Sequence, residues 1–181
     1  MPGRASEATL QVAKDDHVRG SNTAPVTLLV YGDYECPYTR ALELSLAQLR
    51  RRDGKSFRSV FRFFPLREIH PHAQQAAEAA EAVSALAGHD AFWLMHDALF
   101  SNQDDLEMPS IERQATTAGA ERSAFRAALE THKFASRIER DVRSGRANGV
   151  AGTPSVFLNS ERYLGERDVA TLRDAIKGAA R

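Results

Sequence analysis

The chain has 181 residues, 43% of them hydrophobic, and this length suits one well-buried domain that carries an insertion. Its 24 basic and 24 acidic side chains cancel, so no overall field draws the protein to nucleic acid or to an anionic membrane, and we expect neither as a partner. No apolar run is long enough to cross a membrane and no signal peptide is visible, so the sequence predicts a cytoplasmic protein, although a piece of a longer exported protein would read the same way.

The first part of the chain predicts two strands joined by a helix. Residues 1–24 are polar and lack periodicity, so we expect a flexible lead-in whose last residues add at most an edge strand. The run 26–34 is rich in Val, Leu and Tyr, which is typical of a strand buried on both faces. Apolar residues then recur at helical spacing over 37–52, and 57–64 alternates as a second strand. Because a helix connects the two strands, we expect them to be parallel.

A long helical stretch follows, in which small and apolar residues recur at helical spacing. We interpret residues 67–132 as an all-helical insertion between the two halves of one domain, 25–66 and 133–181. The helices of this stretch and its continuation are expected at 73–86, 92–99, 109–119, 121–131 and 133–146.

The C-terminal part returns to strands. The sequence Gly152-Thr153-Pro154 introduces a short apolar strand at 155–159, and 161–164 is typical of the return strand of a hairpin. An amphipathic helix follows over 169–176. The order of elements therefore predicts the α/β class.

Cys36 is the only cysteine in the chain, which excludes an intramolecular disulfide. It lies between the first strand and a helix that opens at Pro37, where unpaired backbone N–H groups and the helix dipole favour a negative charge. We therefore predict an accessible sulfur that ionises more readily than a free thiol, although the neighbouring Glu35 acts in the opposite sense. The alternative is a buried structural cysteine, which is what an isolated cysteine often is.

Several segments together resemble the DsbA-like thioredoxin family over about residues 17–177. They are YGDYECPY (31–38), FPL (64–66), HPHA (70–73), FWLMHD (92–97) and GVAGTP (149–154). The segment 16–28 is most similar to DsbA-like domains found free or fused to bacterial sodium/proton antiporters. The resemblance implies a thioredoxin fold, in which a central mixed sheet is flanked by helices and carries an all-helical insertion. It also implies Cys36 as the attacking thiol and a substrate surface formed by Pro37, Tyr38, Thr153 and a cis Pro154.

The chain departs from the family motif at Thr39, which stands where the family has its second cysteine. Thr39 can donate a hydrogen bond to a thiolate at Cys36 but cannot attack a mixed disulfide. We therefore expect an enzyme of monothiol type, whose mixed disulfides at Cys36 are resolved by an external thiol. The expected partners are a disulfide- or thiol-bearing protein or a small thiol. Glutathione or another low-molecular-weight thiol is the expected co-substrate, with no other cofactor.

Other interpretations stay open at this point. One is other thiol chemistry at Cys36, such as conjugation or peroxide sensing. Another is a non-catalytic module that binds peptides between Cys36 and Pro154, or a regulatory module associated with a transporter. Zinc held by His70, His72, His96 and Cys36 is disfavoured, because neither a paired-cysteine spacing nor an HExxH pattern is present, and we expect no metal. We interpret the two histidines of HPH as part of the turn into the insertion.

Overall fold

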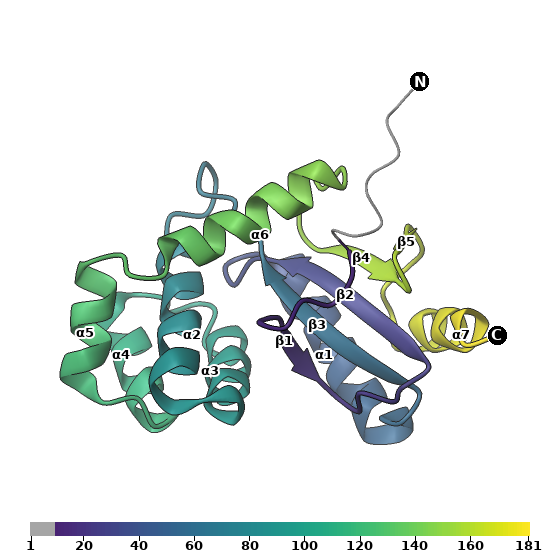
Figure 1. Ribbon diagram of the computed structural model, residues 1–181, viewed down its shortest axis with the longest axis horizontal. Helices are drawn as coiled ribbons and strands as arrows, with labels where there is room; N and C mark the ends of the chain where they lie inside the picture. Colours follow the sequence, from purple (N-terminus) through teal and green to yellow (C-terminus); the bar gives the residue numbers. More distant parts are fainter. Residues whose placement is uncertain (1–9) are drawn as a thin grey trace. The chain divides into compact units, whose positions relative to one another are not determined.

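The computed structural model describes residues 10–181, which form five strands and seven helices (Figure 1). These residues divide into two compact units. The first, called the sheet unit, comprises 10–32, 36–62 and 143–181, and the second, called the helical unit, comprises 33–35 and 63–142. The boundaries of the helical unit lie outside the 67–132 expected from the sequence, because the short segment before Cys36 and the first half of a later helix also belong to it.

The sheet unit is built on one mixed sheet. Its strands are β1 (His17–Arg19), β2 (Val26–Gly32), β3 (Phe57–Phe63), β4 (Ser155–Leu158) and β5 (Glu161–Tyr163), in the order β1-β3-β2-β4-β5. The pairs β1/β3, β2/β4 and β4/β5 are antiparallel. The arrows of β2 and β3 point the same way in Figure 1, so the two strands joined by a helix are parallel. The sheet is therefore mixed, as expected for a thioredoxin fold.

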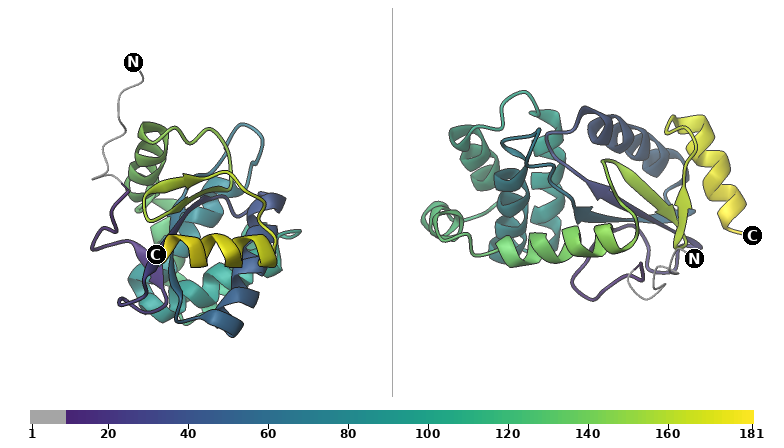
Figure 2. Two further views of the ribbon diagram at one scale, coloured as in Figure 1. Left: turned by 90° about the vertical axis from the view of Figure 1, so that its right-hand side faces the viewer. Right: turned by 90° about the horizontal axis from the view of Figure 1, so that it is seen from above.

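The central strand β2 is buried on both faces, since six of its seven residues are buried. Helix α1 (Pro37–Asp53) and helix α7 (Val169–Ala179) pack against each other in this unit, as Figure 2 shows. Their apolar stripes supply a large part of the core, which includes Leu42, Leu46, Leu49, Leu172 and Ile176. Each of these side chains is almost fully buried, and each contributes roughly 1.5–3 kcal/mol of hydrophobic stabilisation.

The sheet unit begins before residue 25, the start of the domain expected from the sequence. Strand β1 pairs with β3, and Asp16 forms an ion pair of 2.7 Å with Arg62, with both side chains at 5% exposure or less. Arg62 also donates to the backbone oxygen of Gln11 (2.8 Å) and to the hydroxyl of Tyr31 (3.1 Å). Gln11 and Asp16 are thus held by a buried guanidinium, so this part of the lead-in is not flexible, and β1 is the edge strand expected from its last residues. The first nine residues of that segment lie outside the described residues.

The helical unit packs around an alanine-rich helix. Its helices are α2 (Ala73–Ala87), α3 (His89–Ser101), α4 (Met108–Thr117), α5 (Arg122–Glu130) and the first half of α6 (Ala135–Ala147). Small side chains on α2 allow α3, α4 and α5 to contact it. Among residues 10–181, no helix has the length and apolar character needed to cross a membrane.

Candidate active site around Cys36

Cys36 is the N-cap residue of α1, with an extended backbone (φ −78°, ψ 119°) and Pro37 in the first turn of the helix. Strand β2 ends at Gly32, so four residues separate the buried centre of the sheet from the start of the helix. The free N–H groups of this helix end and the helix dipole favour a negative charge at the sulfur.

The loop that precedes β4 lies beside Cys36. Its Thr153–Pro154 peptide bond is cis, and β4 begins at the next residue, Ser155, which pairs with Tyr31 of β2. The serine hydroxyl donates to the backbone oxygen of Gly152 (2.8 Å), which fixes the loop on its own strand. The sulfur of Cys36 accordingly lies 3.4 Å from the backbone oxygen of Thr153.

The sulfur is covered in this state, whereas the sequence led us to expect an accessible one. Cys36 is 3% exposed, and its thiol donates to the backbone oxygen of Thr153 in the loop that precedes β4. The side-chain oxygen of Thr153 is also buried and has no hydrogen-bond partner among the described residues. The Thr153 hydroxyl is therefore a buried polar group without a hydrogen bond to any of these residues, one residue before Pro154.

The other residues expected in the site divide into exposed and buried ones. Pro37 is exposed and Tyr38 is 72% exposed, so both present apolar surface to solvent at the start of α1. Thr39 is fully buried, and it lies on the side of α1 that faces Gly32 of β2. The structure thus brings together Cys36, Thr153 and Pro154, keeps Pro37 and Tyr38 on the surface, and packs Thr39 inside.

The segment 33–35, which leads into Cys36, is fastened within the helical unit. The hydroxyl of Tyr34 lies 3.0 Å from Nδ1 of His96, and the Tyr34 ring packs against Phe100 at a centroid distance of 4.9 Å. The backbone oxygen of Tyr34 accepts a hydrogen bond of 2.8 Å from Gln103. All three links hold the residue two positions before the cysteine.

Two carboxylate–histidine pairs flank Tyr34 in this segment. Oδ2 of Asp33 lies 2.8 Å from Nδ1 of His70, and Oε1 of Glu35 lies 3.1 Å from Nδ1 of His72. These pairs are not predicted from the sequence, in which the two histidines look like part of the turn into the insertion. The signal was the equal spacing of two residues in Asp-Tyr-Glu and in His-Pro-His. Both histidines are engaged by carboxylates, and no metal-binding group of three or more such side chains occurs in residues 10–181.

The ionisation of His72 is shifted by its carboxylate neighbours. The hydrogen bond to Glu35 is the largest influence and raises the pKa of His72 above its ordinary value. Partial burial opposes this, while the charges of Glu35 and Glu107 add to it. Nε2 of the imidazole lies 3.2 Å from Oε1 of Glu107, so both ring nitrogens face a carboxylate.

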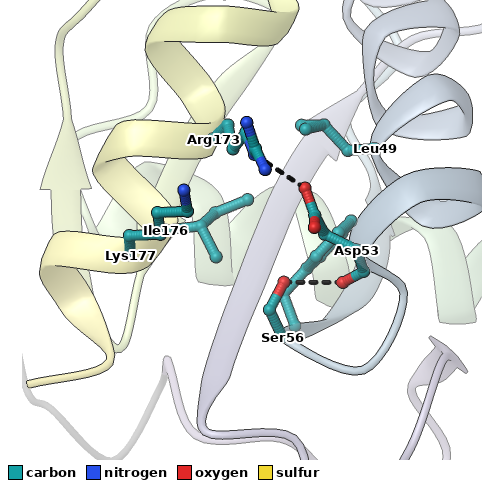
Figure 3. Close-up of a pocket in the computed structure, with 7 residues that line it drawn as sticks. Leu49, Asp53, Ser56, Arg173, Ile176 and Lys177 are labelled. Atoms are coloured by element: carbon teal, nitrogen blue, oxygen red, sulfur yellow. Dashed lines mark hydrogen bonds and ion pairs between the residues drawn. The ribbon is translucent and has the colours of Figure 1, made fainter.

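A small pocket lies at the other end of α1 and is separate from the Cys36 site (Figure 3). It is lined by Leu49, Asp53, Ser56, Phe57, Arg173, Ile176 and Lys177. Arg173 closes one side through an ion pair of 2.8 Å with Asp53. Its volume of about 50 Å³ suits one or two water molecules rather than a substrate.

Related sequences match almost the whole length of the chain. The sequence model of the thioredoxin family matches residues 12–178. The Na(+)/H(+) antiporter NhaA 3 of Salinispora tropica is 41% identical over 164 residues, which cover 91% of this chain and 24% of that protein. The Na(+)/H(+) antiporter NhaA 1 of Mycolicibacterium gilvum is 38% identical over 164 residues, which cover 90% of this chain and 26% of that protein. The chain thus spans about a quarter of the length of these relatives.

Solved structures of lower sequence identity share the fold. BdbD from Bacillus subtilis, in its oxidised form, has a TM-score of 0.81 at 22% identity and covers 91% of this chain and 92% of its own. The catalytic domain of Proteus mirabilis ScsC has a TM-score of 0.81 at 21% identity and covers 97% of this chain and 96% of its own. Because the family match extends over both the sheet and the helical insertion, the chain belongs to the thioredoxin family, with the fold of the DsbA-like thiol–disulfide oxidoreductases.

Proposed function

We propose that this protein is a thiol–disulfide oxidoreductase of monothiol type in which Cys36 is the reacting residue. The observation that carries the proposal is the position of its sulfur, at the N-cap of α1 and 3.4 Å from the backbone of the Thr153–Pro154 loop. A helix N-terminus stabilises a thiolate, and the thiolate is the nucleophile in disulfide exchange. A purely structural cysteine needs neither feature.

The proposed first step is the attack of the Cys36 thiolate on a disulfide. A sulfur–sulfur bond forms between Cys36 and one substrate sulfur, the substrate disulfide breaks, and the second substrate sulfur leaves as a thiolate. In the second step, an external thiolate attacks the mixed disulfide. This step releases the Cys36 thiolate and forms a new disulfide between the external thiol and the bound group. Electrons are conserved at each step without a further oxidant.

The external thiol is needed because the chain has one cysteine. In a protein with two cysteines at this motif, the second thiolate resolves the adduct, whereas Thr39 carries a hydroxyl that is no nucleophile in this exchange. We propose glutathione or another low-molecular-weight thiol as the co-substrate. The adduct at Cys36 should then persist until such a thiol arrives.

The proposed substrate is a disulfide- or thiol-bearing polypeptide that lies across the start of α1. The exposed surfaces of Pro37 and Tyr38 offer it apolar contact. The backbone oxygen of Thr153, which accepts from the Cys36 thiol, offers it a hydrogen bond once that contact is displaced. Because Cys36 is 3% exposed, the incoming sulfur has to displace the contact between the thiol and Thr153.

The test is exposure of the full chain to oxidised glutathione, followed by mass spectrometry of the intact protein. We expect one glutathionyl adduct per chain on Cys36, stable after removal of free reagents and released by added thiol. Cys36→Ser is the control and should acquire none. A wild-type protein that forms no adduct while folded, or that releases it without added thiol, would contradict the proposal and favour a module that binds partners without turnover.

A further inference from the structure

A carboxylate directly precedes the reacting cysteine. Glu35 and Cys36 are joined by a peptide bond, so their Cα atoms lie about 3.8 Å apart. A negative charge on the side chain of an adjacent residue opposes formation of a second one, and an uncompensated Glu35 therefore disfavours the thiolate. The protein has to deal with this charge if Cys36 is to react as a nucleophile.

Within residues 10–181, the carboxylate of Glu35 is bound by His72. Its Oε2 accepts a hydrogen bond of 2.7 Å from the backbone N–H of His72, and its Oε1 lies 3.1 Å from the imidazole Nδ1. His72 is the N-cap residue of α2, so the carboxylate also lies at the positive end of that helix. The side chain of Glu35 is 20% exposed, so solvent reaches only part of it and the contacts with His72 cover the rest.

The imidazole faces a carboxylate on each side. Nε2 of His72 lies 3.2 Å from Glu107, so a doubly protonated ring donates to Glu35 and to Glu107 at once. Asp33 and His70 form a neighbouring pair, in which Asp33 also accepts a hydrogen bond of 2.8 Å from the backbone N–H of Glu35. Asp33 thus holds the backbone of Glu35, whereas His72 holds its carboxylate.

We propose that His72 is a positioning residue for Cys36, which holds the Glu35 carboxylate at the start of α2 and offsets its charge so that the thiolate forms beside it. The inference rests on the proposed function, in which the thiolate is the reacting species. It depends on the peptide bond between Glu35 and Cys36 and on contacts within the helical unit. It assigns a role to the second histidine of the His-Pro-His motif, and the Asp33–His70 pair supports this role by fixing the backbone.

The experiment is the rate of alkylation of Cys36 by iodoacetamide as a function of pH, in full-length wild type, His72→Gln, Glu35→Gln and the double variant. In His72→Gln, the midpoint pH should rise by about 0.5–1 unit, which is about three- to tenfold less thiolate below the midpoint. In the double variant, the midpoint should return to the wild-type value, since no charge is left to offset. Glu35→Gln alone should stay at the wild-type value or below it.

Two controls separate this role from a structural one. His132 pairs with Glu78 at 3.1 Å in the same unit, and Glu78 is not a chain neighbour of Cys36, so His132→Gln should leave the midpoint unchanged. Glu107 is 71% exposed, so Glu107→Gln should fold even where His72→Gln does not. Because it removes one of the two carboxylates that favour the imidazolium, it should raise the midpoint in the same direction by a smaller amount.

An unchanged midpoint in folded His72→Gln overturns the inference, as does an equal shift in His72→Gln and in the double variant. If His72→Gln does not fold, an unchanged midpoint in Glu107→Gln overturns it. Iodoacetamide reacts with a thiolate whether or not the protein exchanges disulfides. A midpoint that depends on His72 in a protein that forms no glutathionyl adduct would therefore reject the proposed function and keep this inference. A glutathionyl adduct in a protein whose midpoint does not depend on His72 would keep the proposed function and reject this inference.

Discussion

The sulfur of Cys36 and the backbone oxygen of Thr153 lie 3.4 Å apart although 117 residues of chain separate them. Pairing of β2 with β4 creates this proximity, because Tyr31 and Ser155 are register partners and each lies a few residues from the site. The contact suits the protonated thiol, since a thiolate has no proton to donate to a carbonyl. The N-terminus of α1 favours the thiolate instead. Reaction therefore requires the sulfur to leave the Thr153 oxygen and to be stabilised by the N–H groups of the helix.

The close approach of α1 to the sheet depends on Gly32. A Cβ atom at this position would lie 2.4 Å from the ring of Phe61 and 2.9 Å from the side chain of Thr39. We expect Gly32→Ala to lower the free energy of unfolding by about 1–3 kcal/mol, because the ring and the helix have to move. Urea unfolding followed by circular dichroism measures the change.

Gly178 offers a matched control within the same unit. A Cβ atom there meets no atom within 4 Å, and the residue lies in α7. Gly178→Ala should leave the stability unchanged or raise it by up to about 1 kcal/mol. Equal losses in both variants would show that the crowding at Gly32 is not the cause.

Much of the fold could be predicted from the sequence because its elements are locally encoded. Alternating and helical periodicities predicted the helices and strands to within a few residues, and the strand–helix–strand order predicted parallel β2 and β3. The proximity of Cys36 and Pro154 followed from the family resemblance rather than from any local pattern. The strands that form the core of the sheet are continuous apolar runs, and such runs can be recognised in a single sequence.

The features that the sequence did not reveal depend on partners distant in the chain. Asp16 looks like an ordinary surface residue until Arg62 is placed beside it. Glu35 and His72 are likewise 37 positions apart, and the equal spacing of Asp-Tyr-Glu and His-Pro-His becomes informative only once the fold places the two motifs together. The burial of Cys36 results from a loop more than a hundred residues away, so a helix N-terminus alone predicted too much exposure.

Removal of one partner from the buried pair of Asp16 and Arg62 should destabilise the start of the fold. Burial by itself lowers the pKa of Arg62, but the hydrogen bonds and charges of Asp16 and then Tyr31 raise it above its ordinary value. Asp16→Asn leaves the guanidinium buried without its counter-ion. We expect a loss of about 3 kcal/mol in urea unfolding at neutral pH.

A loss below about 1 kcal/mol would mean that water reaches the Asp16–Arg62 pair. The ion pair between Arg67 and Glu139 provides the control, because their side chains are 50% and 36% exposed. Glu139→Gln should therefore cost less than about 1 kcal/mol.

The pair of His72 and Glu35 should make stability depend on pH. The pKa of His72 is raised in the folded state, chiefly by the hydrogen bond to Glu35. A raised histidine pKa gives a stabilisation that is fully present below the unfolded value of about 6.5 and is lost as the pH rises through the folded value. The difference in stability between wild type and His72→Gln should thus be larger at pH 6 than at pH 9. We expect it to stay below about 1 kcal/mol, since the histidine is partly exposed to solvent. A difference that grows with pH contradicts this assignment.

Thr39→Cys should convert the monothiol site into one that resolves its own adducts. Position 39 lies three residues after Cys36, one helical turn along α1, and Thr39 is fully buried, so a cysteine of similar size should be accommodated. After oxidation, the variant should contain no free thiol, and its glutathionyl adduct should be released without added thiol, because the new thiolate attacks it. Thr39→Ser is the matched control: it has no second thiol and should trap the adduct as wild type does. Thiol titration and a time course of intact mass follow both properties.

If folded Thr39→Cys does not form the internal disulfide, the sulfur of Cys36 does not point toward the first turn of α1 as exchange requires. In that case the chain is better described as a module that binds its partners without turnover.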